Sequence, residues 1–400
     1  MKTLPALYEY ESLDDVELSE AAARRLRKAA AGVLTVEPGA GEGRWVLTAK
    51  EYVGSLVTED VRVLIRPKIR PENLFLMLEV GLPQSAWRRE AFDYATTDDL
   101  LPSIVAFFAR TAETVVARGL LRAYRPEAER LVALRGRIDI AAQFKLGGLS
   151  TPLACRYDEY TTDIAENRYL RRAVRVALRV PGVLPEDRQR LLRLIAGFED
   201  VVDVPMEADE LDRITITRLN QHYEPALRLA RILLANLTLQ DQSGKSSASS
   251  FLLDMNKLFE RFVEQRLRSA LSGRLQVLGQ SGAYLGTGRQ VPILPDLRFR
   301  RRGVERYVGD IKYKLTTDAK ARTSDYYQLL AYTTALDLPE GVLIYALADG
   351  GAVERSVTVR HAGKVLNTYA IDLSGDANAV DQSINELADW IWKRTVTPRA

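Results

Sequence analysis

The sequence has few of the residues from which many enzyme sites are built. Its 400 residues include one cysteine, Cys155, and two histidines, His222 and His361. A single cysteine excludes an intramolecular disulfide and a cysteine-rich zinc module, which fits a reducing cytoplasm. The histidines are too few for multi-histidine metal sites, and nothing around them supports a Ser-His-Asp or Cys-His arrangement. Any metal site must therefore consist mainly of carboxylates, which favours Mg²⁺ or Mn²⁺.

Long apolar runs and phosphate-binding loops are also missing. No apolar stretch approaches about 18 residues, so we expect no membrane helix. The N-terminus turns acidic before a signal peptide could form. Gly244-Lys245-Ser246 resembles the end of a phosphate-binding loop, but Leu239 stands where that loop needs its first glycine. We therefore expect a cytoplasmic protein without membrane contact and without a nucleotide site in this chain.

Neither sign of charge is in large excess. The chain has 56 Lys and Arg against 53 Asp and Glu, a formal net charge of +3. This balance permits a nucleic-acid partner without requiring one, so local clusters must decide. The candidate DNA-binding cluster lies around a predicted turn and contains Arg298, Arg300, Arg301 and Arg302. It either binds phosphates or forms a solvated hairpin tip, and both interpretations stay open.

The residues that are present predict three regions, because a chain of this length exceeds the size at which one core stops growing. Residues 1–97 are β-rich, residues 98–245 are mainly helical, and Gln240–Ser250 is a polar linker at the end of the second region. The expected strands of the first region are Arg44–Thr48, Tyr52–Val57 and Val61–Arg66. The expected helices of the second are Leu101–Arg118, Ile164–Leu178, Pro185–Phe198 and Tyr223–Leu237.

The third region, residues 246–400, has the element order of an α/β core with a mixed central sheet flanked by helices. Phe251–Leu271 is amphipathic at helical spacing. A second helix is expected to open at Ser324, a favourable N-cap, and to run to about Leu336. The other expected elements are strands at Leu275–Leu278, Ile293–Phe299, Arg306–Lys314, Gly341–Leu347, Ser356–Arg360 and Asn367–Leu373, and a helix at Ala377–Lys393.

Two of these strands place the candidate catalytic residues together. Asp296 follows Pro295, and on the next strand Asp310, Lys312 and Lys314 share one face because side chains alternate along a strand. Carboxylates can hold Mg²⁺, and a neighbouring lysine can orient or deprotonate water or stabilise negative charge. This is the PD-(D/E)xK pattern of Mg²⁺-dependent endonucleases. A chance ion pair between strands is the alternative, which the surrounding helices argue against.

Other residues are weaker candidates for the same centre. Glu260 can add a carboxylate to the metal site, with Glu264 one turn later as the competing choice. The backbone carbonyl of Ile311 can be a further metal ligand, because a hard ion prefers oxygen. Gln328 can position Lys312 or a DNA phosphate. Lys314 joins the arginines as a DNA-binding candidate. The alternative for each helical residue is an ordinary polar position on a helix surface.

Several segments together resemble one protein family. They are Met255–Val263, Pro295-Asp296, Asp310–Lys314 and Asp325–Tyr332 in the C-terminal region, and Tyr52–Gly54, Ile65–Ile69, Leu134–Ile138, Cys155–Tyr160 and Glu166–Leu170 before it. This combination is similar to the McrC family, the endonuclease subunits of the modification-dependent McrBC restriction systems. The resemblance covers most of the chain.

The resemblance implies that the chain acts with a hexameric AAA+ GTPase, McrB, whose nucleotide hydrolysis it stimulates. It further implies that the N-terminal part contacts this partner and that the C-terminal domain cleaves double-stranded DNA. Arg66 and Lys68 are candidates for the partner contact, although structural roles are equally open to them. The residues that match the family's catalytic pattern are Asp296, Asp310, Lys312, Glu260 and Gln328.

Two other functions remain as alternatives. A stand-alone repair or defence nuclease would share the catalytic core, but it would not need so large an N-terminal scaffold. A non-catalytic adaptor that activates an NTPase would not need the intact set of Asp296, Asp310 and Lys312. Cys155 lies near Asp158 and Glu159, but without a histidine nearby we interpret it as a packed thiol rather than a second active site.

Overall fold

The chain divides into two compact units, and both of its ends belong to the same one. In the computed structural model the described residues are 2–79, 100–145, 151–237, 250–316, 321–347 and 353–396. The first unit combines residues 1–100 with residues 246–400, and the second comprises residues 101–245. The regions 1–97 and 246–400, separate in the sequence analysis, therefore share one unit here. Most of the expected linker, together with Gly244-Lys245-Ser246, lies outside the described residues.

Two small sheets form the N-terminal part of the first unit. A three-stranded antiparallel sheet has the order β3-β5-β4, and helix α1 packs against it. A second sheet has the order β1-β7-β6-β11, with β2 also paired to β7. The elements are β1 Lys2–Thr3, β2 Leu7–Tyr8, β3 Ser12–Glu17, α1 Glu20–Ala29, β4 Leu34–Pro38, β5 Arg44–Ala49, β6 Tyr52–Val57, β7 Val61–Arg66 and α2 Pro71–Glu79.

Strand β11 (Phe251–Asp254) joins the two halves of the first unit. It pairs antiparallel with β6, from Phe251 opposite Ser55 to Asp254 opposite Tyr52. The prediction of one helix over Phe251–Leu271 is therefore wrong for its first residues, because pairing with a strand far away in the sequence overrides the local helical pattern. Helix α9 (Met255–Ala270) follows directly, and the Asp254 side chain caps it by accepting from Lys257 N at 3.1 Å.

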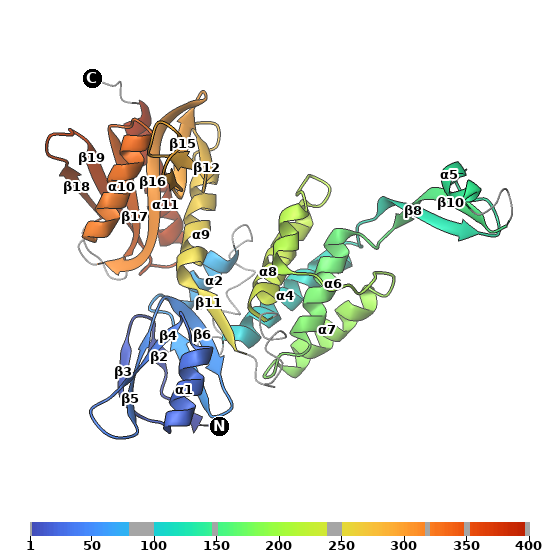
Figure 1. Cartoon of the computed structure of the whole chain (residues 1–400), viewed down its shortest axis with the longest axis horizontal. Coiled ribbons are helices and arrows are strands. Elements are labelled where there is room, and N and C mark those ends of the chain that lie inside the picture. The colour runs from blue at the N-terminus through green and yellow to red at the C-terminus, as the bar shows by residue number, and fades with distance from the viewer. Residues whose placement is uncertain are drawn as a thin grey trace. The chain divides into compact units, whose positions relative to one another are not determined.

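A six-stranded sheet is the centre of the C-terminal half, with the order β12-β15-β16-β17-β19-β18 (Figure 1). Strands β16, β17 and β19 run parallel, and the outer neighbours β15 and β18 run antiparallel to them. The mixed central sheet expected from the sequence is confirmed. The strands are β12 Gln276–Gly279, β13 Ala283–Tyr284, β14 Pro292–Ile293, β15 Leu297–Arg301, β16 Val304–Thr316, β17 Glu340–Leu347, β18 Glu354–Thr358 and β19 Val365–Asp372.

Helices cover both faces of this sheet. Helices α9 and α11 (Ala377–Val396) pack against each other and on the sheet, whereas α10 (Thr323–Ala335) contacts β16, β17 and β19. Two boundaries differ from expectation. Helix α10 has Arg322 as its N-cap with no side-chain cap bond, so Ser324 is not the cap. The strand expected at Ile293–Phe299 is interrupted between β14 and β15, which leaves Asp296 immediately before β15.

The second unit is a bundle of helices with a β-arm. The predicted helices are confirmed within a residue or two and lie side by side in Figure 1. Their bounds are α4 Leu100–Ala117, α6 Ala165–Ala177, α7 Pro185–Gly197 and α8 Glu224–Leu237, with short 3₁₀ turns at η2 Ala208–Arg213 and η3 Gln221–Tyr223. The helical prediction for this region missed the arm, because its strands carry several charged residues and lack a regular apolar alternation.

Helix α4 meets the length and composition of a membrane-spanning helix among the described residues. Its mean hydropathy is 1.4, but 67% of the stretch is buried inside the structure. Core helices of folded domains pass the same test, so this is weak evidence for a membrane span. Arg110 and Glu113 interrupt the apolar run, so the helix meets the test by its mean hydropathy and not by an unbroken apolar stretch.

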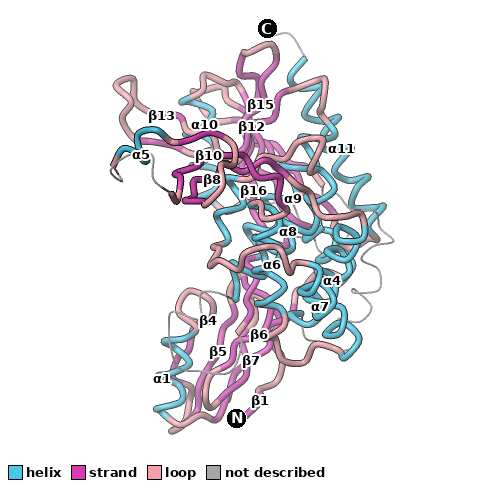
Figure 2. Tube along the Cα trace, turned by 90° about the vertical axis from the view of Figure 1, so that its right-hand side faces the viewer, coloured by secondary structure: helices cyan, strands magenta, loops and turns pink. Residues whose placement is uncertain are grey.

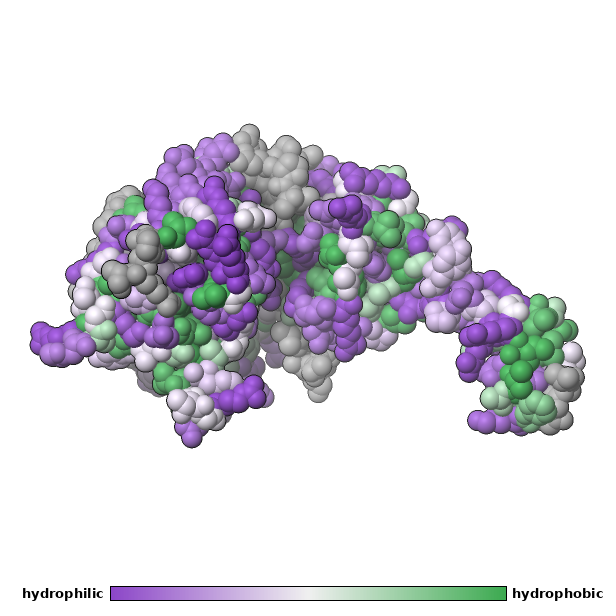
Figure 3. All heavy atoms as spheres, turned by 90° about the horizontal axis from the view of Figure 1, so that it is seen from above, coloured by the Kyte–Doolittle hydropathy of each residue, from purple (hydrophilic) through white to green (hydrophobic). Residues whose placement is uncertain are grey.

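The arm consists of the long antiparallel strands β8 (Ala123–Leu131) and β10 (Leu153–Thr161), with β9 (Arg137–Ile138) and helix α5 (Ile140–Phe144) at its far end (Figure 1). Hydrophobic atoms gather at this far end in Figure 3. Exposed fractions there reach 84% for Val132, 70% for Phe144 and 64% for Ile140. Such a cluster on a projecting element is typical of a surface that another molecule covers.

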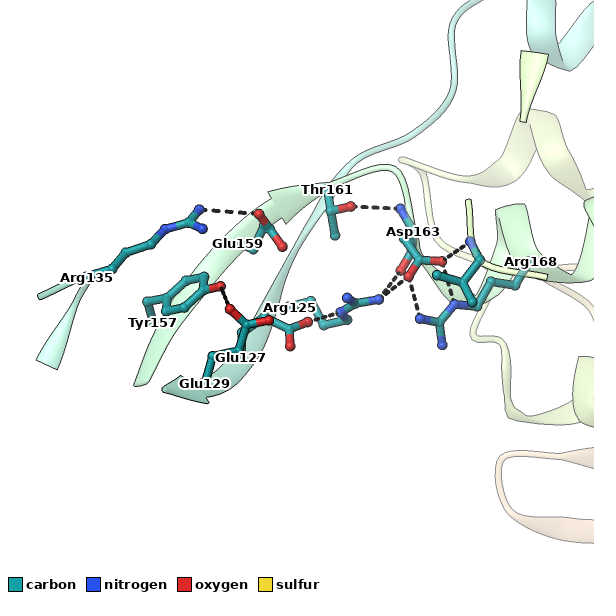
Figure 4. Close-up of polar contacts among 10 residues, drawn as sticks. Arg125, Glu127, Glu129, Arg135, Tyr157, Glu159, Thr161, Asp163 and Arg168 are labelled. Atoms are coloured by element: carbon teal, nitrogen blue, oxygen red, sulfur yellow. Dashed lines mark hydrogen bonds and ion pairs between the residues drawn. The ribbon is translucent and has the colours of Figure 1, made fainter. Parts of the chain in front are cut away.

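Asp163 fixes the base of the arm to the helical bundle (Figure 4). Its buried carboxylate pairs with Arg125 of β8 and with Arg168 of α6, the latter at 2.6 Å, and accepts from Val202 N at 2.8 Å. The hydrogen bonds from Arg168 lower the pKa of Asp163, and those from Val202 N and Arg125 lower it further against the effect of burial. One ionised carboxylate therefore joins the arm, α6 and a following loop.

Candidate active site

The predicted catalytic residues meet where the start of β15 lies beside the second half of β16. Asp310 is 1% exposed, and its Oδ2 lies 2.7 Å from Nζ of Lys312 on the same strand face. Asp296 reaches the same place from the start of β15, where its Oδ2 accepts from Ile311 N at 2.8 Å. Alternation along β16 turns Ile311 and Tyr313 into the core, where both are buried. The structure thus brings Asp296, Asp310 and Lys312 together.

Asp310 is in an unfavourable position for a lone carboxylate. Burial and the negative charge of Asp296 raise the pKa of Asp310 to about 7, although Lys312 opposes the shift. Apart from the ion pair with Lys312, neither of its buried oxygens accepts a hydrogen bond of good geometry. Burial lowers the pKa of Lys312, but the charge of Asp310 more than offsets this effect and leaves that pKa raised. The lysine is therefore an ammonium that can donate to water or phosphate.

Glu260 lies near this pair without completing a metal cluster. It projects from α9, where burial and the charge of Asp296 raise its pKa to about 7. Within the described ranges, no group of three or more acidic, histidine or cysteine side chains is arranged to hold a metal ion. Asp296, Asp310 and Glu260 do not form such a group among the described residues, and the part of Glu260 as a metal ligand stays a prediction. Glu264 is paired with Arg268 at 2.5 Å.

The remaining pair of carboxylates still fits a hard cation. Mg²⁺ is usually held by one or two carboxylates and keeps several waters, so a third protein carboxylate is not required. Asp310 offers two buried oxygens, of which Oδ1 has no donor and Oδ2 is paired only with Lys312, and Asp296 lies beside it. A divalent cation would remove the repulsion that raises the pKa of Asp310. The role of the Ile311 carbonyl as a ligand stays a prediction.

Helix α10 supports the centre from the other side. Gln328 Nε2 donates to the hydroxyl of Tyr332 at 2.7 Å, and Tyr332 donates to the carbonyl of Leu294 at 3.3 Å, two residues before Asp296. The predicted residue Gln328 therefore contacts Tyr332 rather than Lys312. Through these bonds it fixes the segment that carries Asp296.

Lys314 is held by a buried acid of α10. Its ammonium lies 2.7 Å from Asp325 Oδ2, which also accepts from the hydroxyl of Tyr345 at 2.5 Å. Burial raises the pKa of Asp325, but Lys314 and Tyr345 outweigh it and leave that pKa lowered. Asp325 lies in the first turn of α10. It is buried, and it neutralises the proposed DNA-binding lysine.

The predicted arginines extend along β15 from Arg298, two residues after Asp296, to Arg302 in the turn that follows the strand. Arg298 is 8% exposed and donates to Ser281 Oγ at 3.1 Å and to Gly282 O at 3.2 Å. Arg298 and Arg300 both pair with Glu305. The interpretation of Arg298 as a phosphate ligand is therefore wrong, because its guanidinium is buried and already bonded. The outer arginines line a cavity of about 480 Å³ formed by Gly273, Arg274, Leu275, Gln276, Arg300, Arg301, Arg302 and Trp392.

The sequence matches one known protein family over most of its length. Residues 47–346 match the family model described as McrBC 5-methylcytosine restriction system component. The match spans most of the chain and contains Asp296, Asp310 and Lys312. The chain belongs to the McrBC family.

Solved structures of McrBC assemblies are similar to this chain. One is the refined half-complex from the tetradecameric assembly of Thermococcus gammatolerans McrB AAA+ hexamers with bound McrC, with a TM-score of 0.58 at 20% identity over 98% of this chain and 100% of that chain. Another is the Thermococcus gammatolerans McrBC complex, at 22% identity, 68% and 88% coverage and a TM-score of 0.45. The first likeness shows a common fold. No curated protein matches the sequence.

This McrBC-family chain also ties its N-terminal part to the strand of the candidate site. The Tyr313 hydroxyl donates to Glu9 Oε1 at 2.8 Å, and Lys68 N donates to the same oxygen at 2.8 Å. The Tyr10 hydroxyl donates to the carbonyl of Tyr313 at 3.2 Å. Tyr313 directly follows Lys312, so the N-terminal segment restrains the strand of the candidate site. Sequence reasoning missed Glu9, because no local pattern marks an acid that becomes buried against a distant strand.

Because Glu9 is buried, we predict that the free energy of unfolding of this protein depends on pH. Burial raises its pKa to about 7 from 4.5, so the ionised form is disfavoured in the folded state. Stability should fall as the pH rises from the unfolded to the folded pKa. Glu9→Gln keeps the acceptor for Tyr313 and Lys68, so we expect it to stabilise the protein by about 3 kcal/mol near pH 8 and by about half as much near pH 5.5.

Denaturant unfolding of wild type and Glu9→Gln at both pH values measures this effect. Glu11→Gln is the matched control, because Glu11 is half exposed and pairs with the Lys68 ammonium at 3.3 Å. A stability difference for Glu9→Gln that does not change with pH would contradict the buried, shifted carboxyl. Lys68, one of the two residues predicted to contact the partner, is bonded within the chain through both its backbone N–H and its ammonium.

Proposed function

We propose that this chain is the Mg²⁺-dependent endonuclease subunit of an McrBC-type restriction complex and has a PD-(D/E)xK core. The observation that carries the proposal is the meeting of Asp296, Asp310 and Lys312 at one point, with Asp310 buried and its oxygens short of donors. A structural ion pair has no need of a second adjacent carboxylate, whereas a Mg²⁺ site held by two carboxylates does. Membership of the McrBC family supports the same conclusion.

The residues of the site take distinct parts in this proposal. Asp296 and Asp310 would hold Mg²⁺, which when bound lowers the pKa of a water ligand and neutralises charge on the phosphate. Ile311 N fixes one oxygen of Asp296 and thereby aims the other. Lys312, kept in place by Asp310, donates to the attacking water or to the phosphate oxygens as negative charge develops. Glu260 stands behind Asp296 and can take a proton, given its raised pKa.

We further propose that the chain acts with an McrB-type hexameric AAA+ GTPase, whose hydrolysis it stimulates, and cleaves double-stranded DNA. The similar solved chain comes from an assembly of McrB AAA+ hexamers with bound McrC, which supports this partner. The N-terminal region remains the sequence-based proposal for the contact. The apolar far end of the arm is an additional surface for it, because the exposed Val132, Ile140 and Phe144 are unusual on a free tip. We keep a cytoplasmic location as part of the proposal.

Cleavage of plasmid DNA with and without 5-methylcytosine tests the function. The chain is assayed with Mg²⁺, alone and with its McrB-type partner, and with GTP or a non-hydrolysable analogue. We expect cutting only when Mg²⁺, partner and hydrolysable GTP are all present. Robust cutting by the chain alone would favour a stand-alone nuclease. No cutting in any mixture, with GTP hydrolysis still stimulated, would favour the adaptor.

A further inference from the structure

A short hairpin emerges from the sheet directly beside Asp296. Strands β13 and β14 form it, pairing Ala283 with Ile293 and Tyr284 with Pro292. Figure 2 shows its loop standing out beside α10. Both legs are fixed at the candidate active site: Gln280 N donates to the carbonyl of Asp296 at 3.1 Å, and Tyr332 holds Leu294 O. The two legs of the hairpin therefore flank the segment that carries Asp296.

The hairpin is held in one shape by its own bonds. Leu285 N donates to Val291 O and Gly286 N to Gln290 O, both at 3.0 Å. Arg289 and Val291 have φ values of 57° and 51°, a left-handed conformation that is uncommon for residues with a side chain, above all for a β-branched one. The buried Arg298 braces the first leg through Ser281 and Gly282. Such bracing presents the tip as a fixed shape rather than as a loose loop.

The surface of the hairpin is apolar and cationic. Its exposed side chains include Tyr284 at 41%, Leu285 at 44%, Val291 at 61% and Leu294 at 52%. The Arg289 guanidinium lies 5.4 Å from the ring centroid of Tyr284. The segment from Gly279 to Pro295 contains no aspartate or glutamate, although acids make up about half of the charged residues of the whole chain.

This chemistry matches a DNA groove next to a scissile phosphate. Acidic side chains would be repelled by the phosphates, and none is present. The arginine can contact phosphate or a base edge, and the apolar side chains can contact thymine or cytosine methyl groups and sugars. A two-stranded β-ribbon fits the major groove, which is about 12 Å wide. The hairpin reaches about 15 Å from Asp296, which corresponds to roughly four base-pair steps.

We propose that the β13–β14 hairpin inserts into the major groove of duplex DNA beside the phosphate that is cut and positions the duplex at Asp296 and Asp310. The proposal rests on the proposed nuclease function. It gives the hairpin a binding role that is separate from the chemistry. Loss of the hairpin contacts therefore weakens DNA binding and leaves the cleavage step at saturating DNA unchanged.

Arg289→Ala and the double variant Leu285→Ser with Val291→Ser test this role in the assembled complex. We expect each to raise the KM for DNA about tenfold, with kcat within about twofold of wild type, and Arg289→Ala to reduce the salt dependence of binding. Binding is followed independently by the anisotropy of a fluorescein-labelled duplex. Val357→Ser on strand β18 is the control, because Val357 is similarly exposed, at 38%, on a different edge strand.

The possible results distinguish failure of the hairpin proposal from failure of the proposed nuclease function. If wild type cuts and the hairpin variants bind and cut like wild type, the hairpin proposal fails alone. If the variants keep DNA affinity but lose stimulation of the partner GTPase, the apolar tip is a protein interface and the proposal is overturned. If wild type cuts under no condition, the failure lies with the nuclease function. A major-groove blocker that competes with wild type but not with Arg289→Ala would support the proposal.

Discussion

Asp310→Asn is expected to reduce DNA cleavage by at least about 10³-fold while the protein stays folded. The substitution keeps the shape of the side chain but removes the buried charge that pairs with Lys312 and that would hold Mg²⁺. Stability should change little, within about 1 kcal/mol. The reason is that the lost ion pair is offset by removing a carboxylate whose pKa burial raises to about 7.

Plasmid cleavage by the assembled complex measures the loss, and stimulated GTP hydrolysis shows that assembly survives. The shift of the melting temperature on adding Mg²⁺ measures metal binding independently of DNA cleavage. This shift should be present in wild type and absent in Asp310→Asn. Asp389→Asn is the matched control, because Asp389 is an exposed acid that pairs with Arg274 at 2.7 Å. Cleavage by Asp310→Asn within tenfold of wild type would place the active site elsewhere.

Asp163→Asn is expected to destabilise the second unit by about 3 kcal/mol, because it removes a buried negative charge and leaves Arg125 and Arg168 without their shared partner. Hydrogen bonds keep the pKa of Asp163 below its ordinary value, with the largest effect from Arg168 and smaller ones from Val202 N and Arg125. The carboxylate therefore stabilises the fold above its unfolded pKa near 4, and this contribution is lost as the pH falls through the folded value. The variant should lack that acid-side loss.

Urea unfolding across acidic and neutral pH measures this effect, and limited proteolysis reports whether the arm loosens at its base. Asp158→Asn on the same arm is the control, because Asp158 is exposed on β10. We also expect Asp163→Asn to weaken stimulation of the partner GTPase without changing the residues of the nuclease centre. If proteolysis and unfolding match those of Asp158→Asn, the carboxylate is not the anchor that its contacts indicate.

Local patterns were sufficient for the elements whose signal lies within a few residues. Apolar spacing predicted α4, α6, α7 and α8, strand-like runs between turn-prone residues predicted β6 and β7, and a continuous apolar run predicted β17. Alternation along the strand placed Asp310 and Lys312 on one face of β16 and turned Ile311 into the core. Their convergence with Asp296 required only that β15 and β16 be neighbours, which a short turn between strands favours.

Pairings between distant segments lay beyond sequence reasoning. Phe251–Asp254 becomes a strand only because β6 offers it an edge, and Glu9 is buried only because Tyr313 packs over it. The arm was missed because a two-stranded ribbon exposed on both faces carries no apolar alternation. The sequence pattern of Arg298 is that of a surface charge, but in the structure its guanidinium pairs with Glu305 and donates to Ser281.

The sequence by itself determined which residues are available for a candidate site: too few histidines and cysteines for multi-histidine or cysteine-rich metal sites, and an Asp-Asp-Lys set at strand spacing. Those properties depend on residue identity and on a two-residue period, both of which are local. The tertiary structure alone decided which polar groups are buried, how far Glu260 stands from the carboxylate pair, and that a braced hairpin without acids flanks Asp296. Burial and charge proximity arise from contacts between remote segments, and no local pattern contains them.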